Sequence, residues 1–159
     1  MASANKLPTN TLLDAVRTTL AGVLAMLLAR LLKLPEFYWA PISAIVIIQS
    51  TIDPKTLAWQ RFAGTALGAA MGALIGTFFP ASPSSTLIYA AAIFLAGVLC
   101  VLLRFRGAYR FAAITLSIVL LIAHSSVASI VAWHRFVEVS LGIAVALAIA
   151  LLWPIKADY

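Results

Sequence analysis

The sequence is poor in charge and rich in apolar residues. Only 10% of its 159 residues are charged and 64% are hydrophobic, whereas an ordinary soluble domain is about 25% charged and about 45–50% apolar. This apolar excess cannot be hidden inside one small globule, which excludes a soluble protein. Intrinsic disorder is excluded as well, because it requires low hydrophobicity. The composition therefore predicts an all-α membrane protein, whose surroundings are the lipid bilayer.

Residue types that carry chemistry are also scarce. The single cysteine, Cys100, excludes an intrachain disulfide, and its apolar surroundings disfavour a thiolate nucleophile. The two histidines, His124 and His134, have no second ligand cluster and no helical metal-site spacing, so we expect no metal site. The sequence shows no phosphate-binding loop, catalytic triad spacing or paired carboxylates. We therefore expect neither an enzyme nor a bound cofactor.

Six apolar runs bounded by polar residues or proline predict six transmembrane helices. At about 20 residues for each span, they would use about 120 residues. The second run is short or broken, and Asp53 and Pro54 read as a turn before the third. One transmembrane domain would then cover residues 1–159 without a soluble domain. The expected spans are residues 12–34, 37–50, 61–79, 86–103, 111–123 (extending towards 132) and 134–153.

The basic residues predict the orientation of these spans. With the N-terminus inside, lysines and arginines split eight to three between the two sides, and only Arg30, Lys33 and Arg135 lie outside. Cytoplasmic loops carry the excess of basic residues in membrane proteins. We therefore expect both termini in the cytoplasm, with the protein in a bacterial inner membrane. The net charge of +6 follows from this topology, and we expect no nucleic acid partner.

Two segments of the chain align with each other without gaps. Residues 58–80 read AWQRFAGTALGAAMGALIGTFFP, and residues 132–154 read AWHRFVEVSLGIAVALAIALLWP. Matches between apolar residues carry little weight in so apolar a sequence. The match of Arg61 with Arg135 carries more weight because arginine is rare here, and the same holds for the matched tryptophans and prolines. The alignment predicts an internal repeat.

The repeat divides the predicted bundle into residues 11–80 and residues 85–154, approximately. Each half holds three spans, and an odd number of spans inverts the second half relative to the first. Transporters built this way bind their substrates near the middle of the membrane, between the halves. We therefore predict an inverted repeat of three plus three helices.

Small residues recur on one face of the third predicted span. Such a face lets another helix approach closely. It serves either as a dimer seam or sliding surface, or as static packing inside one subunit. We expect a homodimer, with a trimer as the alternative. The predicted helix-packing glycines are Gly64, Gly68, Gly72 and Gly76, with Gly142 on the matching face of the sixth span.

Arg17, Arg61 and Arg135 are the charges expected to enter the membrane. Charges inside a membrane usually face a cavity and mark a pathway, and a guanidinium binds a carboxylate through two hydrogen bonds. The alternative is snorkelling with local pairing, of Arg17 with Asp14 and of Arg135 with Glu138. Glu138 is also the acidic residue most clearly within a span, which makes it a candidate for proton coupling.

Leu34 and Pro35, followed by YWAPISAIVIIQ at residues 38–49, resemble the signature of the FUSC family. That family includes fusaric acid resistance proteins and aromatic acid exporters, and the plant aluminium-activated malate channels are related. The resemblance implies an oligomer of six-span units that passes organic anions. Many members add a helical cytoplasmic domain, whereas this chain stops at Tyr159. The family's arginines are thought to favour carboxylates, and they match Arg17, Arg61, Arg110 and Arg135.

We therefore expect membrane transport of small organic anions, most readily the efflux of aromatic carboxylates. Arg61 and Arg135 would anchor the anion between the halves. A non-transporting scaffold or partner subunit that needs a second chain is the alternative, as is, within transport, an anion channel in place of a proton-coupled carrier. The remaining candidate substrate contacts are Ser43 and Gln49, as hydrogen-bond donors, and Tyr38 and Trp39, which either stack on the substrate or belong to an interfacial aromatic belt.

Overall fold

The computed structural model describes residues 9–79, 85–105, 107–122 and 128–153, and in these ranges it contains six helices and no strand. The all-helical prediction is confirmed for this part of the chain. The helices are α1 (Thr9–Leu31), α2 (Trp39–Ile48), α3 (Pro54–Phe78), α4 (Ser85–Leu102), α5 (Tyr109–Ile122) and α6 (Ala128–Leu152).

Two predicted boundaries are wrong. α3 begins at Pro54, well before Arg61, because Asp53 caps it by accepting a hydrogen bond of 2.9 Å from the backbone N–H of Thr56. Proline is tolerated in the first turn, where its missing N–H is not needed. Residues 128–132, expected to extend the fifth span, instead form the start of α6. His124 and, apart from Ser85, the expected loop after Pro80 lie outside the described residues.

Two helices are long and apolar enough by themselves to cross a membrane, and these are residues 12–31 of α1 and 128–152 of α6. The apolar helices α2, α4 and α5 are shorter. At about 1.5 Å per residue, the ten residues of α2 reach about 15 Å, which is half of the roughly 30 Å hydrocarbon core. Six full spans are therefore more than these helix lengths support.

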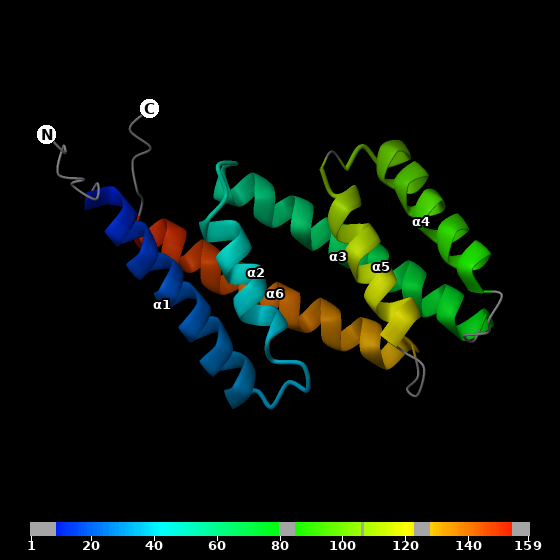
Figure 1. Cartoon of the computed structure of the whole chain (residues 1–159), viewed down its shortest axis with the longest axis horizontal. Coiled ribbons are helices and arrows are strands. Elements are labelled where there is room, and N and C mark those ends of the chain that lie inside the picture. Colours follow the sequence, from blue (N-terminus) through cyan, green and yellow to red (C-terminus); the bar gives the residue numbers. More distant parts are fainter. Residues whose placement is uncertain (1–8, 80–84, 106, 123–127, 154–159) are drawn as a thin grey trace, which may run out of the picture.

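α3 and α6 lie side by side at the centre of an elongated bundle, with α1 and α4 towards opposite ends (Figure 1). α2 packs against α6 and α1, while α5 packs against α3 and α4. If α1 is exchanged with α4, α2 with α5 and α3 with α6, the α3–α6 pair maps onto itself and every other pair of packed helices maps onto another packed pair. Successive helices run in opposite directions, so α1 begins at the end of the bundle where α6 finishes (Figure 1).

Small residues fill the interior, and large apolar side chains point outward. Ala21, Ala25 and Ala29 are fully buried along one face of α1, whereas Leu87 and Phe94 on α4 are 80% and 73% exposed. A soluble protein rarely exposes so much apolar surface. Close helix contacts through small residues, with large apolar residues facing outward, are typical of packing in a bilayer.

The glycines of α3 are covered by the chain itself. A Cβ atom at Gly64 would collide with the backbone carbonyl of Ala108, directly before α5, and one at Gly68 would collide with that of Ala112 on α5. A Cβ at Gly72 would lie 2.8 Å from the Cβ of Val119, also on α5, and one at Gly76 would lie 2.6 Å from the Cβ of Ala128 on α6. This face therefore serves packing inside one subunit and leaves no room for a second copy. The homodimer stays a prediction.

We expect the loss of the α3 cap to lower stability more at neutral pH than in acid. Hydrogen bonds from the backbone N–H and hydroxyl of Thr56 hold the pKa of Asp53 below its ordinary value of 3.8. A carboxyl group whose pKa is lower in the folded state than in the unfolded state stabilises the fold at any pH above the unfolded-state pKa. This contribution is lost as the pH falls through the folded-state pKa. Asp53→Ala should lower the Tm in detergent by about 2–4 °C at pH 7.

The same comparison at about pH 3, below the ordinary pKa of 3.8, should show a smaller difference, because the stability that the lowered pKa contributes is lost as the pH falls towards the folded-state pKa. Asp53→Asn keeps an acceptor at the cap that does not titrate, and it serves as the matched control, because its Tm advantage over Asp53→Ala should be the same at both pH values. A Tm difference for Asp53→Ala that is the same at both pH values would contradict this account.

Candidate functional site

Charged side chains are buried between the helices. Arg17 on α1 and Arg61 on α3 are each 8% exposed, while Arg135 and Glu138 on α6 are 1% and 0% exposed. Glu36, in the α1–α2 connection, is half-buried. This set of three cations and two carboxylates is net positive. Charges at such depth are costly unless paired, and they usually mark a pathway or site.

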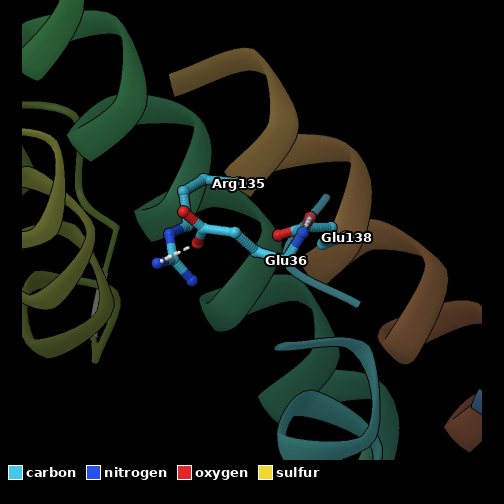
Figure 2. A network of polar contacts seen from close by, with 3 residues as sticks. All are labelled: Glu36, Arg135 and Glu138. Atoms are coloured by element: carbon cyan, nitrogen blue, oxygen red, sulfur yellow. Dashed lines mark hydrogen bonds and ion pairs between the residues drawn. The ribbon is translucent and has the colours of Figure 1, made fainter. Parts of the chain in front are cut away.

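Arg135 is the centre of a polar network (Figure 2). Its Nη2 lies 2.5 Å from Oε2 of Glu36, and the backbone N–H of Glu36 donates a hydrogen bond of 2.8 Å to Oε1 of Glu138. The guanidinium carbon lies 3.8 Å from the ring centroid of Trp39 on α2, a cation–π contact. In the described residues, Nε and Nη1 of Arg135 find no hydrogen-bond partner. Arg135 therefore keeps free donors of the kind that bind a carboxylate.

Sequence reasoning missed Glu36. Spacing along one helix suggested that Glu138 pairs with Arg135, but the ion pair joins Arg135 to Glu36, because the α1–α2 connection brings that carboxylate to the guanidinium. The suggested pairing of Arg17 with Asp14 is absent between these two described residues, since Arg17 is buried and Asp14 is exposed. Glu36 was detectable only as an isolated acid beside the apolar run of the second span.

Arg61 makes comparable contacts from α3. Its Nη2 donates a hydrogen bond of 3.0 Å to Oγ of Ser43, which in turn donates to the carbonyl of Trp39 at 2.8 Å. Its guanidinium carbon lies 5.0 Å from the ring centroid of Phe111 on α5. Consecutive turns of the short helix α2 therefore contact two of the three buried arginines, Arg135 through Trp39 and Arg61 through Ser43.

The contacts of the two arginines correspond across the two halves of the chain. The gapless alignment of the α3 and α6 sequences pairs Arg61 with Arg135. The ring beside Arg61 is Phe111, and the ring beside Arg135 is Trp39. The two rings are nearly as far apart along the chain as the two arginines are. Each arginine on a long central helix thus contacts an aromatic ring on the short helix of the other half. Short apolar segments in corresponding places of two halves are a pointer to the binding site of a transporter.

Two glycines repeat the same correspondence. A Cβ at Gly68 on α3 would collide with the carbonyl of Ala112 on α5, and a Cβ at Gly142 on α6 would collide with the carbonyl of Ala40 on α2. The alignment of α3 with α6 pairs the two glycines, and the two alanines directly follow Phe111 and Trp39. Close contact between a long helix and a short one is therefore built in the same way on both sides of the bundle.

Of the other sequence-predicted residues, Tyr38 lies close enough to Arg135 to interact with it, whereas Arg110 and Gln49 lie apart from the Arg135 network. Arg110 is exposed, with its guanidinium carbon 4.7 Å from the Phe111 ring centroid, on the Arg61 side. Gln49 is exposed and donates a hydrogen bond of 2.8 Å to Oγ1 of Thr18 on α1. Tyr38 is exposed beside Trp39, and Arg17 is buried on α1. The structure therefore assembles Arg61, Arg135, Trp39, Ser43 and Glu138 around α2, without Gln49.

A family model described as fusaric acid resistance protein-like matches residues 24–149, which is well over half of the chain. The matched range includes Arg61, Arg135 and the whole of α2, and it leaves out Arg17. No curated protein and no solved structure matches the chain.

Proposed function

Since this chain belongs to the fusaric acid resistance protein-like family, a family of membrane transporters rather than enzymes, we propose that it moves small organic anions across the membrane. The buried guanidinium of Arg135, with donors left over after its ion pair, is the observation that carries this proposal. Spare donors on a planar guanidinium match the two oxygens of a carboxylate. The buried charge is net positive, which favours an anion over a cation.

Aromatic carboxylates are the substrate class that fits these contacts best. The rings of Trp39 and Phe111 each lie beside a buried arginine. An aromatic ring and a guanidinium that can bind a carboxylate are therefore neighbours at two places in the bundle. An aromatic ring gains from contact with another ring, and its carboxylate from the guanidinium. We propose efflux from a bacterial cell through its inner membrane, in a homodimer.

The proposed path runs between two inverted halves of three helices each, with both termini in the cytoplasm. The mapping of packed helix pairs onto each other supports this repeat, as do the matched surroundings of Arg61 and Arg135. The alternating direction of the helices agrees with termini on one side (Figure 1). Short α2 and α5 would meet the anion within the bilayer, with α3 and α6 behind them.

Transport of labelled benzoate by the purified full chain in liposomes tests this proposal. We expect Arg61→Ala to lower the rate about tenfold or more, which corresponds to the loss of one charge-assisted hydrogen bond. Lys55→Ala is the matched control, because it removes an exposed cation from the same helix, and its rate should stay close to wild type. Neutral benzamide should be moved no faster than in protein-free liposomes.

Two results would overturn the proposal. One is wild-type protein that moves no more benzoate than empty liposomes, which would favour a scaffold or partner subunit if a second chain restored the flux. The other is equal loss of rate in Arg61→Ala and Lys55→Ala. A proton gradient applied in the same assay separates the two kinds of transport, because it drives benzoate accumulation in a coupled carrier and does not change uncoupled anion flow through a channel.

A further inference from the structure

The anion position on Arg135 is already occupied by a carboxylate of the chain. The ion pair with Glu36 joins an Arg135 side chain that is 2% exposed to a Glu36 side chain that is 27% exposed. Glu36 belongs to the connection between α1 and α2, whereas Arg135 lies within α6. Glu36 therefore covers Arg135 from the loop side, with one part of its side chain in contact with the surroundings (Figure 2).

The corresponding place beside Arg61 holds no such carboxylate. The alignment of α3 with α6 pairs Glu138 with Gly64, and the pairing of Trp39 with Phe111 likewise pairs Glu36 with Ala108. The correspondence is physical, because a Cβ at Gly64 would collide with the backbone of Ala108, just as Glu138 contacts the backbone of Glu36. Both acids of the Arg135 network are thus replaced by small neutral residues around Arg61.

The surroundings of the two arginines therefore differ in charge while they correspond in geometry. Arg135 has two carboxylates near it, Glu36 and Glu138. Arg61 contacts the neutral hydroxyl of Ser43, and Arg110 adds a second cation beside the same Phe111 ring. An incoming anion is attracted to the Arg61 side and meets a competing carboxylate on the Arg135 side.

We propose that Glu36 is an internal ligand for Arg135 that a substrate carboxylate must displace, so that Glu36 sets the affinity for the transported anion. The proposal rests on the proposed function, because it assigns the carboxylate of that substrate to Arg135. A substrate carboxylate bound through the spare donors alone would lie beside that of Glu36 on one guanidinium. Two negative charges so close repel each other, so the substrate and Glu36 compete for Arg135. Glu36 can leave because it is in a connection and partly exposed, whereas Glu138 is fully buried on α6.

Competition of this kind lowers the apparent affinity by a calculable factor. If the site is free of Glu36 for only a fraction of the time, the measured Kd is the intrinsic Kd divided by that fraction. Removal of the charge of Glu36 frees the site and should lower the Kd. A residue that merely stabilises the fold would change the Tm and leave the affinity of the folded protein alone.

Glu36→Gln is the variant that tests the proposal, because it removes the charge and keeps the hydrogen bond from the backbone N–H of residue 36 to Glu138. We expect the Kd for benzoate, measured by titration calorimetry in detergent, to fall about tenfold or more, and half-saturation of flux in liposomes to fall with it. Asp14→Asn, which removes an exposed carboxylate from α1, is the matched control and should leave both values within about twofold of wild type. Glu36→Ala should change the affinity in the same direction as Glu36→Gln.

The outcomes separate this inference from the proposed function. Equal benzoate affinities in wild type and both folded Glu36 variants, with flux intact, overturn the role of Glu36 and leave transport standing. Tighter benzoate binding by Glu36→Gln in a protein that moves no benzoate supports the role of Glu36 and overturns transport. Absence of benzoate binding in wild type and in both Glu36 variants overturns the two proposals together.

Discussion

Arg135→Ala is expected to abolish benzoate flux and to lower the free energy of unfolding by about 3–5 kcal/mol, as is usual when one partner of a buried ion pair is removed. The guanidinium is 1% exposed and pairs with Glu36, while Glu138 accepts the backbone N–H of that same residue. Its removal leaves the fully buried Glu138 and the half-buried Glu36 without a cation. It also removes the proposed ligand of the substrate.

The two consequences of Arg135→Ala are separable by a second variant. Arg135→Ala combined with Glu36→Gln removes one of the stranded charges, so part of the stability should return while the flux stays absent. Arg135→Lys keeps the charge but loses the planar fork that contacts Trp39, and it should transport more slowly than wild type. Wild-type flux in Arg135→Ala, measured in the same liposome assay, would show that Arg135 takes no part in transport.

Gly64→Ala is expected to have the second large effect, a loss of about 1–3 kcal/mol of stability from overpacking. The added Cβ would collide with the carbonyl of Ala108 and lie 2.8 Å from the Cβ of Phe111. A backbone carbonyl cannot rotate away as the end of a flexible side chain can. α3 and α5 would therefore have to separate, and Phe111 with them would shift from Arg61.

Gly22→Ala provides the matched control within the same chain. Gly22 is also a buried helical glycine, but a Cβ there would have the Cδ1 of Ile45 as its nearest neighbour at 3.3 Å, the end of a side chain that can adjust. Alanine favours a helix over glycine by about 1 kcal/mol, so Gly22→Ala should leave the Tm unchanged or raise it. Thermal unfolding in detergent measures both variants, and equal Tm losses would contradict the assigned α3–α5 contact.

Much of the candidate site was accessible from the sequence because arginine is rare in this composition. The alignment of Arg61 with Arg135 suggested that they occupy equivalent places, and both are buried with an aromatic ring beside them. The family resemblance, seen in residues 34–49, is confirmed by the family match. Glu36 was missed because its role depends on a contact between the α1–α2 connection and α6, which no local spacing reveals.

Composition alone predicted a helical membrane protein, because a chain that is 64% hydrophobic cannot bury so many apolar residues in one small globule, and helices satisfy their own backbone groups in lipid. The family match supports this prediction. Only the tertiary structure decided which charges meet. The ion pair of Arg135 with Glu36, in place of its helical neighbour Glu138, depends on how the α1–α2 connection lies over α6. Helix formation is local and can be read from the chain, whereas the partner of a buried charge is set by packing between distant segments.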